Sequence, residues 1–159
     1  MTNINSLVYQ IPFNKPTFVG NELKYIQEAL SHGHISGDGI FITKCNALFE
    51  LELGVKKSFL TPSCTRVLEM VAILLNIQPG DEVIIHSFTF VSTVNAFIIR
   101  GAKPVFSDIR EYTLNIDENL LENLITNRTK AIIIVHNAGV GCEMDSIMDI
   151  AGKYSIPGC

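Results

Sequence analysis

The sequence predicts an α/β fold in which a mostly parallel sheet lies between two layers of helices, giving three layers in all. Short runs rich in β-branched residues alternate with stretches whose apolar residues recur every three or four positions. Some of these runs, such as residues 131–135, are apolar throughout, as is typical of strands covered on both faces. Repeated strand–helix units of this kind form parallel sheets with helices on both sides.

The first part of the chain, residues 1–55, is predicted to be an N-terminal helical segment. Residues 56–159 are predicted to form the alternating strand–helix part of the same partial domain. Apolar residues at helical spacing mark two helices in the first part: Leu23, Ile26 and Leu30 in one, and Ile42, Cys45 and Phe49 in the other.

The second part begins with a short predicted strand at residues 58–60 and a helix over residues 64–76. The turn Gln78-Pro79-Gly80-Asp81 then leads into a β-branched strand at residues 82–86. Residues 90–100 read as a helix that Gly101 ends, since glycine adopts the left-handed backbone of a helix C-terminus.

The remaining elements follow the same alternation. A strand begins at Pro104, and Asp117 caps the next predicted helix. The inner face of that helix consists of four residues: Leu120, Leu121, Leu124 and Ile125. A buried strand follows at residues 131–135, and a last helix runs over residues 144–153.

Composition excludes several classes of protein. Of 159 residues, 47% are apolar and 18% are charged, which is typical of a globular chain. The net charge of −4 offers no basic surface for nucleic acid or membrane lipid. No apolar run is long enough for a bilayer, and the first residues lack a signal-peptide pattern, so we expect a cytoplasmic protein. The four cysteines lack metal-ligand spacing, so we expect free thiols and no metal site.

Polar residues follow three of the predicted strands, at residues 61–65, 86–89 and 136–139. In parallel sheets ligands bind beyond the carboxyl ends of the strands, where these segments should converge. Ser63, Cys64 and Thr65 open a helix, whose free N–H groups and partial positive charge suit an anion. They serve either as a simple helix cap or as a phosphate site. Cys64 is either a reactive thiol or a small residue that fits the turn.

Other residues at the same edge keep two interpretations each. Phe88 and Phe90 either pack in the core or stack on a flat ligand ring. His86 and His136 act either as acid–base groups or as hydrogen-bond partners of loop backbone. Gly139-Val140-Gly141 either begins a dinucleotide-binding motif or only forms a turn, because Met144 occupies the position of the third glycine.

With these residues in hand, the chain resembles the N-terminal part of the DegT-like sugar-nucleotide aminotransferases, which have the aspartate aminotransferase fold. The resemblance rests on eight ordered segments: Ile11-Pro12-Phe13-Asn14, Gly37-Asp38-Gly39, Thr61-Pro62-Ser63-Cys64-Thr65, Gln78-Pro79-Gly80-Asp81-Glu82-Val83-Ile84, Thr89-Phe90-Val91-Ser92-Thr93, Arg100-Gly101-Ala102-Lys103, Asn115-Ile116-Asp117-Glu118 and Cys142-Glu143-Met144-Asp145. Within this family the chain is most similar to the 4-aminotransferases that act on TDP-4-keto-6-deoxyglucose in enterobacterial common antigen synthesis.

The resemblance implies a fold, a cofactor and a reaction. The fold would be the N-terminal part of the large domain of a fold type I enzyme dependent on pyridoxal 5'-phosphate. Ser63, Cys64 and Thr65 would hold the cofactor phosphate, and Phe90 would stack on its ring. The complete enzyme, a cytoplasmic homodimer, would transfer an amino group from glutamate to a keto nucleotide sugar for polysaccharide biosynthesis.

The sequence also departs from the family pattern. The lysine that bonds the cofactor and the aspartate beside the pyridine nitrogen have no match here, so no catalytic residue is assigned. Arg66, Val67 and Asn137 stand where the family has other residues, and residues 158–159 end the resemblance. We interpret the chain as an N-terminal fragment, from a truncated reading frame or a decaying gene, that is inactive alone.

Three hypotheses follow, in order of preference. The first is an aminotransferase fragment without catalysis of its own. The second is a non-catalytic module that binds a phosphorylated ligand or a sister subunit through residues 63–65. The third is a dinucleotide-binding domain, which rests on Gly139 and Gly141 alone.

Overall fold

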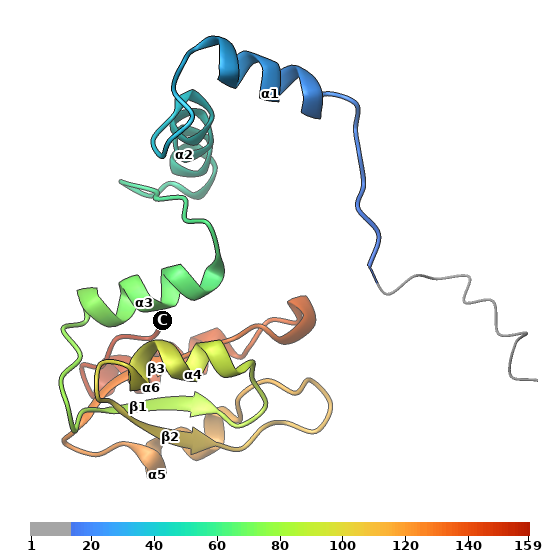
Figure 1. The fold of residues 1–159 in the computed structure, drawn as a ribbon. Coiled ribbons are helices and arrows are strands. Elements are labelled where there is room, and N and C mark those ends of the chain that lie inside the picture. Colours follow the sequence, from blue (N-terminus) through green and yellow to red (C-terminus); the bar gives the residue numbers. More distant parts are fainter. Residues whose placement is uncertain (1–13) are drawn as a thin grey trace, which may run out of the picture. The chain divides into compact units, whose positions relative to one another are not determined.

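A computed structural model describes residues 14–159, which divide into two compact units. The first unit ends at Leu60 and the second runs from Thr61 to Cys159. Figure 1 draws both, and each is described here by itself. Of the segments that carry the family resemblance, residues 11–13 lie outside the described part of the chain. No helix among residues 14–159 is long and apolar enough to cross a lipid bilayer.

The first unit contains the two predicted helices, α1 (Glu22–Ser31) and α2 (Ile40–Leu53). The rings of Tyr25 and Phe41 meet edge to face with centroids 5.4 Å apart, and Lys44 forms an ion pair with Glu28 at 3.5 Å. Neither helix has a buried residue. Because α2 is apolar on most sides, it carries much exposed apolar surface.

The predicted strand at residues 58–60 is wrong, since this segment is irregular and pairs with no strand in the described chain. Side chains of α2 satisfy its backbone instead. The N–H of Ser58 donates to Glu50 at 3.1 Å, and the N–H of Leu60 donates to Asn46 at 3.1 Å. Once these donors are taken by side chains, a β-ladder has no advantage for the segment.

The second unit is built on a parallel sheet of three strands, β1 (Glu82–His86), β2 (Lys103–Ser107) and β3 (Thr129–Ile133), in the order β2-β1-β3. The chain moves from β1 to β2 on one side and then returns to β3 on the other. The carboxyl ends of β1 and β3 therefore flank a topological switch point. This confirms the predicted α/β fold with a parallel sheet.

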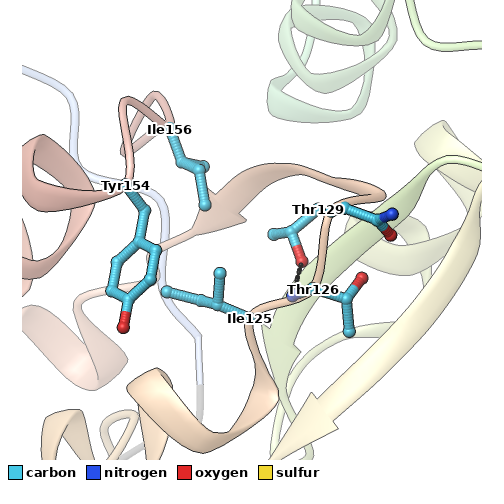
Figure 2. Close-up of a pocket in the computed structure, with 6 residues that line it drawn as sticks. Ile125, Thr126, Thr129, Tyr154 and Ile156 are labelled. Atoms are coloured by element: carbon cyan, nitrogen blue, oxygen red, sulfur yellow. Dashed lines mark hydrogen bonds between the residues drawn. The ribbon is translucent and has the colours of Figure 1, made fainter.

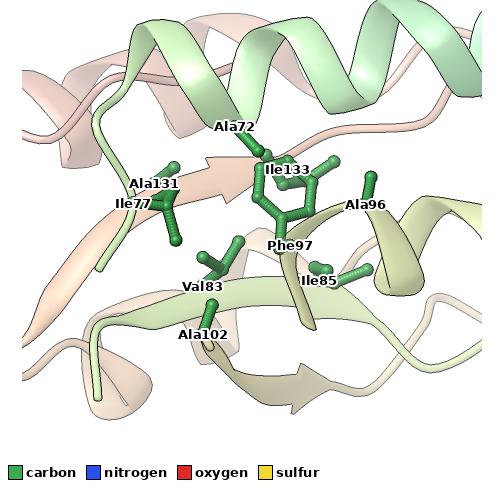
Figure 3. Close-up of a cluster of buried hydrophobic side chains, with 9 residues drawn as sticks. All are labelled: Ala72, Ile77, Val83, Ile85, Ala96, Phe97, Ala102, Ala131 and Ile133. Atoms are coloured by element: carbon green, nitrogen blue, oxygen red, sulfur yellow. The ribbon is translucent and has the colours of Figure 1, made fainter. Parts of the chain in front are cut away.

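Helices α3 (Cys64–Leu74) and α4 (Val91–Ile98) cover one face of the sheet (Figure 1). Alternate residues of β1, Val83 and Ile85, point to this face. Figure 3 shows the ring of Phe97 from α4 close to Ala72 from α3, above the strands. Burying a valine, isoleucine or phenylalanine side chain contributes about 1.5–3 kcal/mol, so this cluster holds α3 and α4 on the sheet.

The opposite face of the sheet is covered by a second apolar cluster. Ile84 of β1 and Ile132 of β3 meet Leu121 of α5 (Leu121–Leu124) and Ile147 of α6 (Met144–Lys153) there. A single 3₁₀ turn, η2 (Glu118–Leu120), precedes α5. The sheet is thus enclosed between two helical layers, as the continuously apolar strands predicted.

Most helix bounds agree with the sequence, and two details differ. The side chain of Asp117 caps η2 by accepting from the N–H of Asn119 at 3.1 Å, as predicted. Leu120, however, is exposed rather than on the inner face, because the 3₁₀ turn rotates it away from the line of Leu121 and Leu124. The predicted strand 131–135 is displaced two residues toward the N-terminus, as β3.

The last residues of the chain lie beside β3 on the side away from β1. Ile132 donates its N–H to the carbonyl of Pro157 at 3.1 Å and accepts from the N–H of Cys159 at 2.9 Å. The bridge between Ile132 and Gly158 is parallel. Residues 157–159 therefore follow the direction of the sheet, so that β3 has hydrogen-bonded neighbours on both sides.

Gly101 and Pro79 come together where the turns before β1 and β2 meet. Gly101 has a φ of +88°, and a Cβ placed on it would lie 2.9 Å from the Cα of Pro79. The carbonyl of Gly101 also accepts the N–H of Gly80 at 3.0 Å. A side chain at position 101 would therefore suffer both from the left-handed backbone and from a clash with rigid backbone.

Replacing Gly101 by alanine should lower the free energy of unfolding by about 1–3 kcal/mol, since backbone strain and overpacking act together. Urea denaturation followed by circular dichroism measures the change. Gly152→Ala is the matched control, because this glycine lies in α6 with open space around it. Alanine there should keep or raise stability, and equal losses for both variants would contradict the close approach at Gly101.

Glu82 is a charged residue buried at the amino end of the sheet, with only 3% of its surface exposed. Its carboxylate accepts from the Thr126 hydroxyl and from the Arg128 guanidinium, both at 2.6 Å, and Lys103 lies 3.9 Å away. The Thr126 hydrogen bond, followed by the charges of Arg128 and Lys103, lowers the pKa of Glu82 despite the opposing effect of burial.

Because the folded chain lowers the pKa of Glu82, the unfolded chain takes up its proton first as the pH falls. The contribution of Glu82 to stability is complete above its ordinary pKa of about 4.3 and is lost below it. Glu82→Gln should therefore make the free energy of unfolding fall less steeply as the pH drops below about 4.3. An unchanged acid limb in urea titrations between pH 3 and pH 6 would contradict this role.

Candidate functional site

The carboxyl edge of the sheet at the switch point brings together three segments of the second unit. Residues 87–90 follow β1, residues 134–139 follow β3, and the start of α3 lies at the same edge because α3 runs antiparallel to the strands (Figure 1). The three polar segments predicted to converge therefore lie at one edge of the sheet. Residues 61–65 lie there because they lead into α3, and not because they follow a strand.

Ser63 caps α3, and the turn leaves two backbone donors free. The hydroxyl of Ser63 accepts the N–H of Arg66 at 3.4 Å, while the hydroxyl of Thr61 donates to the Ser63 carbonyl at 2.9 Å. The N–H groups of Cys64 and Thr65 have no partner among residues 14–159. Free donors at a helix N-terminus bind anions such as phosphate, helped by the helix dipole.

Arg66, a departure from the family pattern, does not occupy this turn. Its guanidinium binds the carboxylate of Glu69 at 2.5 Å, one helical turn further along α3. The positive charge is therefore compensated on the helix side. The free N–H groups of Cys64 and Thr65, together with the hydroxyl groups beside them, remain the polar groups that this turn offers to an anion.

Phe90 is the residue before α4 and is 75% exposed, which is unusual for a large aromatic side chain. Phe88 is 52% exposed, so neither phenylalanine belongs to the core. The Thr89 hydroxyl donates to that of Thr93 at 3.3 Å and fastens the loop to α4. An aromatic ring held at a helix start, open to solvent, can stack on a flat ligand.

His86 is fully buried at the end of β1, on the same side as Ile84. Neither ring nitrogen has a hydrogen-bond partner among the described residues. Burial lowers the pKa of His86, and the smaller opposing effect of the Phe88 backbone does not cancel it. His86 is thus a neutral residue beneath the edge and contacts no solvent.

His136 is exposed in the loop that follows β3. Its Nδ1 accepts the N–H of Cys142 at 3.1 Å, and the Cys142 thiol donates to the carbonyl of Val135 at 3.3 Å. Burial raises the pKa of the Cys142 thiol, which keeps it protonated as a donor. The loop between β3 and α6 is therefore closed on itself by the His136 side chain.

Asn115 is a residue of this edge that the sequence-based site did not include. It is 2% exposed, and its Nδ2 donates to the carbonyls of Val140 and Gly141 at 2.9 and 3.0 Å. Its Oδ1 accepts the N–H of Asn137 at 2.9 Å. The side chain thereby ties the loop after β2 to the loop after β3. Its sequence signal is its place in the segment Asn115-Ile116-Asp117-Glu118, which carries part of the family resemblance but indicates no site.

The glycines at positions 139 and 141 form a turn rather than an open cradle. The N–H of Gly139 donates to the backbone carbonyl of His136 at 3.2 Å, and the N–H of Val140 donates to the carbonyl of Asn137 at 2.9 Å. The Gly141 carbonyl accepts from the Asn115 side chain. Helix α6 begins only at Met144. These bonds leave few donors for a pyrophosphate, which favours the turn interpretation.

The lysines of the second unit lie at the opposite edge. Lys103 begins β2, Lys130 is the second residue of β3, and Lys153 is the last residue of α6, which starts at the carboxyl edge and runs away from it. Within residues 61–159 no lysine amine is therefore placed at the switch point. Residues 14–159 also contain no cluster of side chains suited to a metal ion.

A cavity of about 390 Å³ lies at this opposite edge (Figure 2), lined by residues 125–127 and Thr129 after α5 and by Tyr154 and Ile156 after α6. The backbone N–H of Thr126 donates to the Thr129 hydroxyl at 2.9 Å, and the Thr126 hydroxyl donates to Glu82. The hydroxyl groups of Thr126 and Thr129 are thus engaged in holding the loop before β3. The cavity lies away from the switch point.

A model of the DegT/DnrJ/EryC1/StrS aminotransferase family matches residues 16–157. The chain belongs to this family. It is 38% identical over 146 residues to the spore coat polysaccharide biosynthesis protein SpsC of Bacillus subtilis, covering 92% of this chain and 37% of that protein. It is 38% identical over 141 residues to a GDP-perosamine synthase of Caulobacter vibrioides, covering 89% and 38%.

Solved structures agree with this assignment. An aminotransferase from Psychrobacter cryohalolentis superposes with a TM-score of 0.85 at 31% identity, covering 92% of this chain and 38% of that one. NtdA from Bacillus subtilis, with the cofactor PMP bound, superposes with a TM-score of 0.81 at 30% identity, covering 86% and 31%. The fold is that of the fold type I enzymes, and the chain spans between 29% and 41% of the length of these and similar relatives.

Replacing His86 by leucine should change how stability depends on pH. In the parent chain the buried ring stays neutral while the unfolded chain binds a proton below the ordinary histidine pKa of about 6.5, so stability falls as the pH drops through 6. His86→Leu should remove this loss of stability near pH 6 and should leave unchanged the loss that Glu82 causes at lower pH. Urea midpoints from pH 5 to pH 8 measure the effect, with the exposed His32→Gln as control.

Proposed function

We propose that this chain is the segment of a DegT-family aminotransferase that holds the phosphate and one ring face of pyridoxal 5'-phosphate. The observation that carries the proposal is that two free N–H groups, those of Cys64 and Thr65, lie at the same edge as the exposed ring of Phe90, the residue before the neighbouring helix α4. Both stand at the switch-point edge, where α/β sheets bind ligands. Family members bind this cofactor or its amino form, as NtdA does.

Each residue has a distinct task in this site. The N–H groups of Cys64 and Thr65, with the hydroxyls of Ser63 and Thr65, would donate to phosphate oxygens. Phe90 would stack on the pyridine ring and exclude water from that face. When bound, the cofactor supplies an electron sink for amino-group transfer. The chain's own residues bind and orient it, and the reacting lysine is not assigned to any residue here.

The substrate of the family-length enzyme, on this proposal, is a TDP-4-keto-6-deoxyhexose, and glutamate is the amino donor. The product would enter a surface polysaccharide of the enterobacterial common antigen type. The ordered segments quoted above support this choice, and a GDP-perosamine synthase among the relatives supports a nucleotide sugar in general. The family-length protein is proposed to be a cytoplasmic homodimer in which this chain forms part of the large domain.

A second candidate function is a non-catalytic module that binds phosphate, the cofactor or a subunit. It is favoured by the positions of Lys103, Lys130 and Lys153, which all lie away from the free N–H groups of α3. On this alternative, the chain binds the cofactor without a covalent bond. The two candidates share the binding site and differ only in chemistry.

Pyridoxal phosphate should shift the backbone amide signals of Cys64 and Thr65 in ¹⁵N-labelled chain, because their N–H groups gain an acceptor. Thr65→Ala should weaken binding about 10- to 100-fold, as expected for loss of a hydrogen bond to a charged group. Phe90→Ala should weaken it by up to about tenfold through lost stacking. Ser146→Ala on α6 and the exposed Phe106→Ala on β2 are matched controls that should bind normally. Amides that stay unmoved at saturating cofactor would refute the proposed site.

Borohydride reduction tests whether a lysine of this chain bonds the cofactor, which neither candidate function expects. With one equivalent of pyridoxal phosphate, mass spectrometry should find none of Lys103, Lys130 and Lys153 modified stoichiometrically, because these lysines lie at the other edge. Full modification at one lysine, abolished by its replacement with arginine, would instead make this chain a reacting partner of the cofactor.

A further inference from the structure

The loop between β3 and α6 fixes the tautomer of an exposed histidine. Nδ1 of His136 accepts the N–H of Cys142 at 3.1 Å, so this nitrogen carries a lone pair and no proton. The proton of the neutral ring therefore sits on Nε2. Among residues 14–159 nothing accepts a hydrogen bond from Nε2, and the residue is exposed. The ring thus offers one oriented N–H donor to an external acceptor.

The position of this donor depends on Asn115. The N–H of Asn137, the residue after His136, is bound by Oδ1 of Asn115 at 2.9 Å. The carbonyls of Val140 and Gly141, just before Cys142, are bound by Nδ2 of the same side chain. Asn115 thus holds both ends of the segment whose closure orients the His136 ring. Its burial and full set of bonds make the arrangement rigid.

The loop lies where a ligand of this sheet would bind. His136 follows β3, and β3 and β1 flank the switch point, with Phe90 beyond the end of β1. On the proposed function, the α3 turn and Phe90 would bind the phosphate and one ring face of the cofactor. They leave the remaining polar oxygens of such a ligand without a donor, and Nε2–H of His136 is a donor without an acceptor.

We infer that His136 donates a hydrogen bond through Nε2–H to an oxygen of pyridoxal phosphate and that Asn115 is the positioning residue that sets this donor. The inference rests on the proposed function, since it requires the cofactor to bind at the switch-point edge. Asn115 acts through the loop and touches no ligand itself.

The tautomer is tested first, in the intact chain without ligand. Ring ¹⁵N spectra distinguish a protonated nitrogen from one with a lone pair, and His136→Phe assigns the signals. The inference requires the Nε2–H form at His136. Asn115→Ala should replace this single form by a mixture, whereas Asn119→Ala, an exposed asparagine on η2, should not. A Nδ1–H form in the parent chain overturns the inference.

Binding is tested with pyridoxal phosphate as the probe. Saturating cofactor should shift the Nε2–H signal, and His136→Phe should weaken binding about three- to tenfold, the loss of one hydrogen bond. If the Ser63–Thr65 amides shift while the His136 ring does not, the inference fails and the proposed function stands. If neither moves, both fail. Asn115→Ser, whose hydroxyl can replace one of these bonds without burying a charge, should give an intermediate loss and serves if Asn115→Ala does not fold.

Discussion

The parallel pairing of β1 with both neighbouring strands is the constraint on which the rest of the second unit depends. Because β1 is central, its alternating side chains must satisfy two helical layers at once: Val83 and Ile85 face α3 and α4, and Ile84 faces α5 and α6. The chain can leave β1 on one side and return on the other only by reversing there. The crevice at the carboxyl edge is a direct result of that reversal.

The two edges of the sheet have opposite chemistry. The amino edge carries buried and compensated charge, with Glu82 held by Arg128 and Thr126. The carboxyl edge offers neutral donors, namely backbone N–H groups and hydroxyls, beside the aromatic ring of Phe90. The cations of Arg66, on α3, and of Arg110, in the loop after β2, are paired with Glu69 and Glu118. An anion bound there would rely on the helix terminus rather than on a free positive side chain.

Much of this arrangement follows from sequence pattern. The apolar run of β1 and the helical spacing of α3 and α6 are local signals, and each appears in the structure with nearly the predicted bounds. The fold class and the family were also predicted correctly. The strand predicted at residues 58–60 does not form, because Glu50 and Asn46 on the preceding helix bind its backbone. The local sequence pattern does not indicate these contacts.

The site was predictable where a local rule places the residue. A helix start identifies Ser63, Cys64 and Thr65, and the structure leaves free N–H groups at the last two. Their role toward the cofactor, and that of Phe90, stays a prediction. Asn115 was missed because its three partners lie more than twenty residues away in sequence. The burial of His86 follows from its two-residue spacing from Ile84, a signal that was available.

The contact of Gly101 with Pro79 has a consequence for the order of folding. It joins the turn before β1 to the turn before β2, which are close in sequence, whereas β3 must close a longer loop to reach β1. Loop closure costs more entropy as loops lengthen. The first crossover should therefore assemble early, with β3 docking on it afterwards. The ligand edge, which needs β3, would then be among the last parts of this unit to form.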